Sequence, residues 1–261
     1  MNKNLNLIYF SATDTTKKIV KQIGSCMAEN YKEYDITLDN DRNTNLSFNS
    51  DDVVVVGAPV YAGRVPKFLI DYFKRIKGSN TLAIFVVLYG NRAYEDALLE
   101  LKDTFEANGF LGIAAGAFIG EHSYTKEVAN KRPDVNDLEI ANVFGVDILN
   151  KIKNQNLNLI NSKLDVKGNY PYKERKNSPK VAPITSNTCI DCGICEKHCP
   201  MGAINSNNFK EIDADKCIKC CSCVKKCPVE AKYMDNEFVN KLTKMLIDNC
   251  SLNRNEPELF I

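Results

Sequence analysis

The sequence predicts an α/β domain with a doubly wound, five-stranded parallel sheet over residues 1–153, followed by a small pseudo-symmetric α+β unit. Near-continuous apolar runs alternate with helix-period patterns through the first of these segments, as in parallel sheets that helices cover on both faces. Nine of the eleven cysteines then fall between positions 189 and 227. A chain of 261 residues has room for both units, because domains commonly hold about 100–200 residues.

Each strand and helix of the first domain is predicted from its own pattern. Residues 4–10 form an apolar opening strand, and apolar side chains at helical spacing follow it: Ile19, Val20, Ile23 and Met27. Further strands are expected at 33–38, 52–57, 81–88 and 111–119, with helices near 66–77, 93–108 and 136–153. Sheets of this kind bind ligands beyond the carboxyl ends of their strands, so the loops at those ends are the candidate site.

The loop after the first strand is rich in hydroxyl groups: Ser11, Thr13, Thr15 and Thr16, with Asp14 among them. A strand, a hydroxyl-rich turn and a helix make a layout that binds phosphate, because the first N–H groups of a helix are free and its dipole favours an anion. The alternative is an ordinary helix N-cap, for which Ser, Thr and Asp are also the preferred residues.

Three more loops at the same edge carry candidate binding residues. After the third strand come Pro59, Val60, Tyr61, Ala62 and Gly63; after the fourth come Tyr89, Gly90, Asn91, Arg92 and Tyr94; after the fifth come His122, Ser123 and Tyr124.

The cysteines form two runs of the pattern C-x2-C-x2-C-x3-C-P: Cys189, Cys192, Cys195 and Cys199, then Cys217, Cys220, Cys223 and Cys227. This spacing predicts two 4Fe–4S clusters, and in two-cluster proteins the fourth cysteine of each run serves the other cluster. Zinc is the rival ligand, because paired C-x-x-C motifs also bind zinc. Zinc ribbons, however, do not require four cysteines per run followed by proline.

The two runs form an internal repeat, in which Ser186 to Ile204 aligns with Ala214 to Lys232. The ninth cysteine, Cys221, aligns with Gly193 and is therefore expected to be a small residue packed beside a cluster. His198 is expected to pack or face solvent, because its run already supplies four cysteines.

Charge and cysteine usage limit the compartment and the partners. Residues 1–150 hold 16 basic and 20 acidic side chains, and residues 151–261 hold 18 and 13. Thiolates and phosphate make the loaded protein acidic, which argues against nucleic acid as a partner. The cysteines follow metal-ligand order, so we expect the reducing cytoplasm. No apolar run approaches the length of a membrane span.

Residues 1–153 resemble a flavodoxin domain that binds FMN, on the loops Pro59–Pro66 and Tyr89–Tyr94. The whole chain resembles the flavodoxin–ferredoxin fusion proteins of anaerobic bacteria and archaea. The resemblance implies that Ser11, Thr13, Thr15 and Thr16 hold the phosphate. It also implies that Tyr61 to Gly63 and Tyr89 to Arg92 line the isoalloxazine, and that His122 to Tyr124 close its edge. Flavodoxins usually carry Gly where this chain has Asp14.

Two arginines in these loops suggest a function for charge. Arg64 and Arg92 would stabilise a reduced, anionic flavin by Coulomb attraction. Replacing either one is then expected to lower the two-electron midpoint potential, unless the side chain points away. His122 is expected to donate to the flavin edge, to shuttle a proton, or to be an ordinary loop residue.

The rest of the chain divides into a linker at 154–185, a two-cluster ferredoxin unit at 186–234 and a tail at 235–261. The linker is expected to be extended chain laid over a surface. A short amphipathic helix is predicted in the tail from Phe238, Leu242, Met245, Leu246 and Leu252, packing back on the body. Cys26 and Cys250 are expected to be structural.

The combination predicts an electron-transfer flavoprotein that joins one-electron carriers, such as a ferredoxin, to a one- or two-electron partner. Three alternatives remain open: a flavin-site reductase of a small molecule such as a quinone, nitro compound or dioxygen, direct oxidation of NAD(P)H, and a redox sensor.

Overall fold

A six-stranded sheet is the centre of the N-terminal domain in the computed structural model, which describes residues 3–154 and 163–261. Its strands are β1 (Asn4–Tyr9), β2 (Lys32–Asp35), β4 (Asp52–Pro59), β6 (Thr81–Tyr89), β7 (Phe110–Ile119) and β12 (Glu258–Phe260). They lie in the order β12-β7-β6-β4-β1-β2. The first five strands pair in parallel and confirm the predicted doubly wound sheet. The sixth, β12, was not predicted and pairs antiparallel with β7.

Helices cover both faces of the sheet. They are α1 (Thr15–Met27), α2 (Lys67–Phe73), α3 (Ala97–Glu106) and α4 (Val135–Lys153), with a 3-10 turn η1 (Asp39–Asn43) and a short strand pair of β3 (Ser47–Phe48) and β5 (Lys77–Gly78). Alternate residues of each strand face opposite sides. In β1, Ile8 joins the core under α2 and α3, while Leu7 joins the core under α1 and α4.

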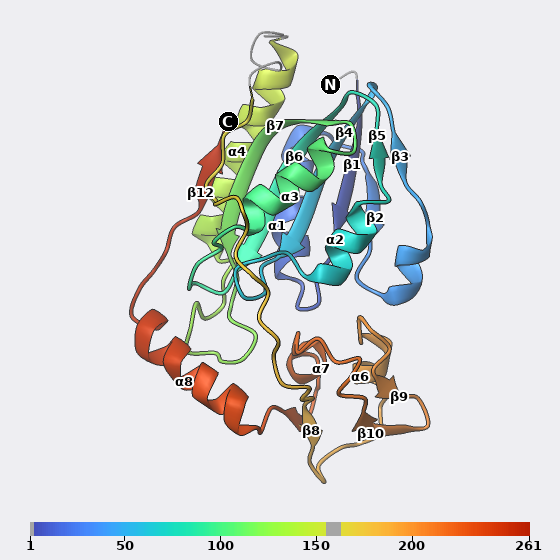
Figure 1. The fold of residues 1–261 in the computed structure, drawn as a ribbon, viewed down its shortest axis with the longest axis vertical. Coiled ribbons are helices and arrows are strands. Elements are labelled where there is room, and N and C mark those ends of the chain that lie inside the picture. The colour runs from blue at the N-terminus through green and yellow to red at the C-terminus, as the bar shows by residue number, and fades with distance from the viewer. Residues whose placement is uncertain (1–2, 155–162) are drawn as a thin grey trace.

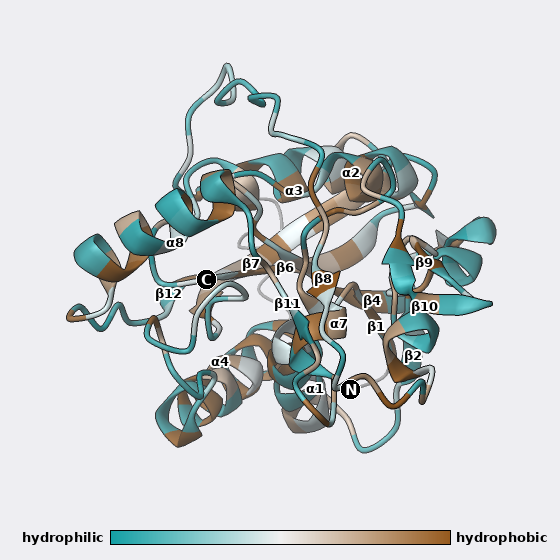
Figure 2. Ribbon diagram, turned by 90° about the horizontal axis from the view of Figure 1, so that it is seen from below, coloured by the Kyte–Doolittle hydropathy of each residue, from teal (hydrophilic) through white to brown (hydrophobic). Residues whose placement is uncertain are grey.

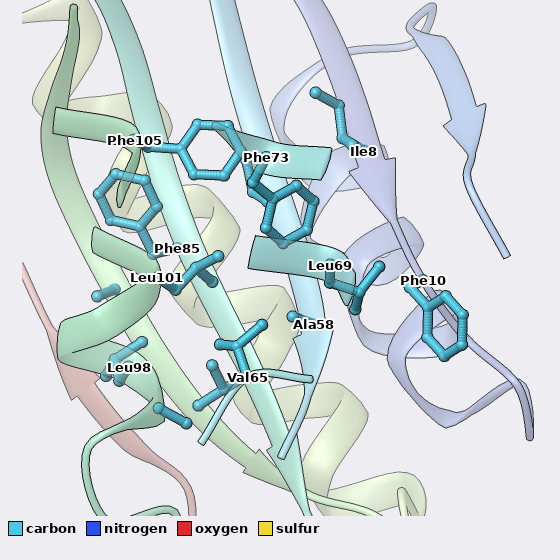
Figure 3. Close-up of a cluster of buried hydrophobic side chains, with 14 of the residues drawn as sticks. Ile8, Phe10, Ala58, Val65, Leu69, Phe73, Phe85, Leu98, Leu101 and Phe105 are labelled. Atoms are coloured by element: carbon cyan, nitrogen blue, oxygen red, sulfur yellow. The ribbon is translucent and has the colours of Figure 1, made fainter. Parts of the chain in front are cut away.

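The core under α2 and α3 is built on aromatic side chains (Figure 3). The ring of Phe105 lies 5.2 Å from that of Phe73 and 6.0 Å from that of Phe85, centroid to centroid. Such distances are typical of favourable tilted aromatic pairs. This packing fixes α2 and α3 on the sheet, and with them the loops that precede each helix.

The cysteine-rich unit lies beneath the carboxyl edge of the sheet (Figure 1). Its elements are β8 (Ile184–Thr185), α6 (Ile194–Lys197), β9 (Ile204–Asn205), β10 (Asn208–Ile212), α7 (Ser222–Lys225) and β11 (Lys232–Tyr233). Antiparallel pairs β9/β10 and β8/β11 hold it together. In the view from below, α7 lies in front of the central strands of the sheet (Figure 2).

The tail contains α8 (Glu237–Cys250) and then β12, so it packs back on the body as expected. The predicted apolar face of α8 is correct at Leu246, which is buried, and at Leu242, which packs against the same cluster. It is wrong at Phe238 and Met245, which are 40% and 41% exposed. Val239 and Cys250 are buried in addition to Leu246. Leu252 lies beyond the helix and is 97% exposed.

The predicted linker falls partly on residues 155–162, which lie outside the described residues. Its later part runs along α3 through polar contacts. Asp96 accepts the backbone N–H of Asn169 (2.8 Å), and the hydroxyl of Tyr172 donates to Asp103 (2.7 Å). Across residues 3–154 and 163–261, no helix has the length and apolar character needed to span a membrane.

Candidate functional site

In the hydroxyl-rich loop between β1 and α1, some side chains are buried in the fold and others line the surface. Ser11 and Thr16 are buried, and the Ser11 Oγ accepts the backbone N–H of Lys17 (3.0 Å). Thr13 and Thr15 line an open pocket at the start of α1. The first N–H groups of the helix are not used within it, so the pocket offers both hydroxyl and N–H donors.

Asp14 does not cap α1 with its side chain. Its backbone lies in the left-handed region (φ 65°), a conformation that glycine adopts at little cost. The carboxylate points instead to the cysteine-rich unit and pairs with Lys226. The residue that departs from the flavodoxin pattern therefore joins the two units.

The other three loops meet beside the first through backbone hydrogen bonds. Val60 N–H donates to Leu88 O (2.8 Å), and Gly120 N–H donates to Tyr89 O (3.0 Å). A Cβ at Gly90 would lie 2.4 Å from Cδ2 of His122, so only glycine fits between these two loops. The structure thus brings the loops after β4, β6 and β7 together, as predicted from their place at the carboxyl edge.

His122 is held in a neutral form. Its ring lies edge-on to that of Tyr124 (5.4 Å between centroids), and its Nδ1 accepts the Tyr124 N–H (3.2 Å). Burial lowers the pKa of His122 to about 4, and the charges of Lys225 and Arg92 act in the same direction. At neutral pH the ring is therefore uncharged and has one N–H donor and one acceptor nitrogen.

Two residues of the loop after β6 hold the tail of the chain. The Asn91 side chain donates to the backbone oxygens of Cys250 (3.0 Å) and Asn253 (2.6 Å), and the Tyr94 hydroxyl donates to Glu258 (2.9 Å). Both residues are buried. Because these side chains hold the tail in place, the backbone of Asn91 is the part of that residue that remains available to a ligand.

The two arginines have different surroundings. Arg64 is buried and donates through Nε (2.8 Å) and Nη2 (2.6 Å) to the Glu100 carboxylate, with its guanidinium 4.7 Å from the Tyr172 ring centroid. Arg175 pairs with the same carboxylate (2.7 Å), so Arg64 is held in an internal ion-pair network with α3 and the linker. Arg92 is 37% exposed and pairs with Glu95 (2.6 Å).

The eight predicted cluster ligands line two cavities. One is lined by Cys189, Cys192, Cys195 and Cys227. The other is lined by Cys199, Cys217, Cys220 and Cys223. In each cavity the fourth cysteine comes from the other run, which is the crossed arrangement expected for two-cluster proteins.

The backbone conformation follows the internal repeat of the sequence. Positive φ angles recur at Asp191 and Lys219, at Gly193 and Cys221, and at Gly202 and Glu230. The N–H of Ala203 donates to Cys199 Sγ and that of Ala231 to Cys227 Sγ, both at 3.2 Å. Hydrogen bonds to sulfur are one way in which a protein sets cluster potential.

The second cavity is the more buried of the two. Burial raises the pKa of the Cys220 and Cys223 thiols to about 12. Thiolates there need a positive partner, which iron supplies. Cys221 is 2% exposed and does not line the first cavity, whereas it borders the second beside the four ligands.

No three His, Cys, Asp or Glu side chains in the described parts of the chain lie close enough to bind one metal ion. Four sulfurs around one zinc would lie roughly 3.8 Å apart, from a Zn–S length of about 2.3 Å. The two sets of four cysteines each line a cavity of their own, and their spacing along the chain is that of 4Fe–4S ligands.

The second cavity adjoins the loops of the α/β domain. Cys220 belongs to the core cluster under α2 and α3, and Tyr61 and Ile218 pack against that cluster. Burial raises the pKa of Tyr61 well above its usual value, and the nearby Cys220, Cys221, Tyr124 and Cys217 add to this shift. Tyr61 and Tyr124 therefore stand between the loops and the second set of cysteines.

The residues that line the pocket beside Thr13 and Thr15 can be compared with what a phosphate needs. It is lined by the cationic residues Lys18, Lys131, Arg132 and Lys225 and by the carboxylates of Asp14 and Glu121. Arg132 is already paired with buried Asp137, which leaves three lysines against two carboxylates. The lining is still net positive and carries hydroxyl donors. These residues fit a phosphate dianion at the start of α1.

Comparisons with known proteins agree with this geometry. A flavodoxin domain family matches residues 6–126, and a 4Fe-4S dicluster domain family matches residues 188–232. A comparison with curated proteins gave no match.

Among solved structures, the chain is similar to a flavodoxin from the domain Archaea, with 17% identity and a TM-score of 0.40 over 57% of this chain and 99% of that one. It is similar to flavodoxin 1 from Bacillus cereus, with 15% identity and a TM-score of 0.40 over 57% and 98%. A Fusobacterium nucleatum flavodoxin bound to flavin mononucleotide gives 13% identity and a TM-score of 0.37 over 59% and 98%.

A flavodoxin domain implies FMN, and a dicluster domain with these cysteines implies 4Fe–4S clusters. The chain is therefore an electron-transfer protein in which an N-terminal flavodoxin domain is followed by a C-terminal 4Fe-4S dicluster domain of the ferredoxin type.

Proposed function

We propose that the protein transfers electrons within one chain, between FMN at the carboxyl edge of the sheet and two 4Fe–4S clusters. One cluster is held by Cys189, Cys192, Cys195 and Cys227, and the other by Cys199, Cys217, Cys220 and Cys223. Clusters pass single electrons and FMN accepts one or two. The chain would thus connect one-electron carriers to a one- or two-electron partner.

The observation that carries this proposal is the nearness of Tyr61 to the second set of cysteines. Cys220 belongs to the core cluster against which Tyr61 and Ile218 pack, and Cys220, Cys221 and Cys217 contribute to the raised pKa of Tyr61. Cys220 is buried and Tyr61 is half-buried, and limited access of water lowers the solvent reorganisation that charge transfer requires. The second cluster is therefore the one placed to exchange electrons with FMN.

The proposed FMN site combines the phosphate loop with the three neighbouring loops. Its residues are Ser11, Thr13, Thr15 and Thr16 at the phosphate, and Pro59, Val60, Tyr61, Ala62, Gly63, Tyr89, Gly90, Asn91, Arg92, Tyr94, His122, Ser123 and Tyr124 around the ring. The side chains of Asn91 and Tyr94 act there by fixing the loop against the tail. Neutral His122 keeps one ring nitrogen as a hydrogen-bond donor.

The first cluster is the proposed exchange point with an external redox protein. Cys192 is exposed, and beside it Ile190 and Val229 are 60% and 37% exposed. Small, partly apolar contact areas are typical of transient electron-transfer complexes. Electrons would then run between the partner, the first cluster, the second cluster and FMN in that spatial order.

Domain bounds and location remain predictions of the same kind. We place the flavodoxin domain at 1–153, the linker at 154–185, the cluster domain at 186–234 and the tail at 235–261. The cytoplasm is the predicted compartment, because thiolate-bound clusters need reducing surroundings.

An anaerobic photoreduction experiment on the reconstituted protein tests the proposal. Absorbance and EPR follow the flavin and both clusters after a brief pulse of reduction, and a potentiometric titration assigns each potential. We expect a redistribution phase whose rate does not change with protein concentration. A rate proportional to concentration would mean transfer between molecules and would overturn the proposal.

Equivalent positions of the repeat supply matched variants. Cys220→Ser removes a ligand of the second cluster, and Cys192→Ser removes the corresponding ligand of the first. We expect the intramolecular phase to the flavin to disappear in the former and to persist in the latter. The opposite result would reverse the order of the clusters.

A further inference from the structure

The phosphate pocket contains one residue that the flavodoxin domain does not supply. Lys225 lies at the end of α7 in the cluster domain, yet it lines the pocket together with Thr13, Thr15 and Lys18. The side chain of Lys225 is 20% exposed. Its ammonium group therefore approaches the start of α1 from the other domain.

Glu121 holds the Lys225 side chain at this place. The two groups form an ion pair, and the Glu121 carboxylate is 19% exposed. Burial alone would raise the pKa of Glu121, but hydrogen bonds from Lys225 and from the Lys131 N–H (2.8 Å) lower it. Glu121 is thus negatively charged beside the pocket and holds Lys225 in place. It also competes with a bound phosphate for the ammonium group of Lys225.

Lys226 connects the same helix end to the phosphate loop itself. Its ammonium group pairs with Asp14, and its side chain is 21% exposed. Asp14 has a left-handed backbone at this turn, where glycine would be the more favourable residue, and its side chain supplies the contact with Lys226. The neighbouring residues Lys225 and Lys226, at the end of α7, therefore pair with two residues that line the pocket, Glu121 and Asp14.

The internal repeat shows that cluster binding does not require these contacts. Lys197 and His198 occupy the positions equivalent to Lys225 and Lys226, at the end of α6, and both are exposed. The two halves bind equivalent clusters with different surroundings at these side chains. The placement of Lys225 and Lys226 follows from docking against the flavodoxin domain.

We propose that the cluster domain completes the FMN site, with Lys225 as a phosphate-binding residue and the Asp14–Lys226 pair as the contact that positions it. This inference rests on FMN binding at the loops described above. Lys225 leaves part of its pairing with Glu121 and donates to the phosphate, and the phosphate is enclosed between two domains.

The arrangement couples FMN binding to cluster assembly. Lys225 lies two residues after the ligand Cys223, in a helix of four residues. So short a helix has little stability of its own, and ligand binding fixes it. Loss of the clusters should therefore weaken FMN binding, and by reciprocity bound FMN should strengthen the binding of the clusters.

Flavin titration of the cluster-loaded full chain tests the proposal, with fluorescence quenching as the readout. We expect Lys225→Ala to raise the Kd for FMN about five- to tenfold, as for loss of a partly exposed charged contact. The Kd for riboflavin, which has no phosphate, should not change. Lys197→Ala, at the equivalent position of the repeat, is the matched control and should leave both constants unchanged.

Glu121→Gln separates phosphate binding from a purely structural ion pair. It frees Lys225, so we expect FMN to bind as tightly as to the wild type or more tightly. Equal weakening of FMN and riboflavin in Lys225→Ala, or weakening by Glu121→Gln, would overturn the role of Lys225. Failure of the wild-type chain to bind FMN at all would instead overturn the proposed function.

Discussion

Ile190 and Ile218 occupy equivalent positions of the internal repeat, each directly after the first cysteine of its run, but their surroundings are opposite. Ile218 packs against the core cluster under α2 and α3, whereas Ile190 is 60% exposed. The same difference separates Pro200, which is buried and accepts a hydrogen bond from Arg42 (2.8 Å), from the exposed Pro228. One face of the pseudo-symmetric domain is covered by the flavodoxin domain, and the equivalent face is free.

This asymmetry makes Ile190 the residue to change when testing external electron exchange. Ile190→Ser should keep both clusters and FMN but lower the second-order rate of reduction by a reduced ferredoxin roughly three- to tenfold, because weak interfaces depend on a few apolar contacts. Stopped-flow absorbance measures this rate. Leu252→Ser, at another exposed residue on the tail, is the control, and equal rates in all three proteins would contradict the assignment of this face.

Arg64 should matter for stability more than for the flavin. Arg64→Ala removes two hydrogen bonds to the buried Glu100 carboxylate, which keeps Arg175 as its partner (2.7 Å), so we expect a cost of about 1.5–3 kcal/mol. For a chain of this size we expect the melting temperature to fall by roughly 3–12 °C. Arg92→Ala removes a partly exposed pair and should cost less than about 1 kcal/mol. Thermal unfolding of the two variants measures both losses of stability, and similar values would argue against this difference.

Cys221 should be dispensable for both clusters. Its left-handed backbone (φ 58°) corresponds to that of Gly193 (φ 72°), so Cys221→Gly relieves strain of about 1–2 kcal/mol. Loss of the buried thiol offsets this by roughly 1 kcal/mol. We expect unchanged iron content and a stability change within about 1 kcal/mol. Cys220→Ser, at the adjacent position, should lose a cluster; a loss of iron in Cys221→Gly would show that this thiol is a ligand.

His122 should make the protein sensitive to mild acid. Its pKa is lowered from 6.5 to about 4 in the fold, so the folded state favours the neutral ring. This stabilisation is present above about pH 6.5 and is lost as the pH falls toward 4. The linkage gives a loss of about 2 kcal/mol between pH 7 and pH 5. Denaturant unfolding of His122→Gln should show a correspondingly smaller loss than wild type, and parallel pH profiles would refute the assignment.

Structural features that depend on residues close together in the sequence were predicted correctly. The apolar positions of α1, Ile19, Val20, Ile23 and Met27, are all buried as expected, because helical spacing fixes which side chains share a face. The same reasoning was only partly right for α8, where two apolar stripes lie side by side: Leu242 and Leu246 pack as predicted, but Phe238 and Met245 do not. The surface on which the helix packs decides between them, so Val239 is buried and Phe238 is not. The short strand β12 offers too few residues to carry a pattern.

The alternation of strands and helices in the first domain could be predicted from the sequence alone, as could the two cysteine runs and their repeat. These properties are local to a strand, a helix or a short loop. The tertiary structure determined the partners and the burial of the charged side chains. The sequence places Arg64 and Arg92 equally close to the loops, but Arg64 is buried and pairs with Glu100, from α3, whereas Arg92 is partly exposed and pairs with Glu95. The partners of Asp14 and Glu121 lie 212 and 104 positions away along the chain. Such contacts follow from the packing of whole domains, on which local spacing carries no information.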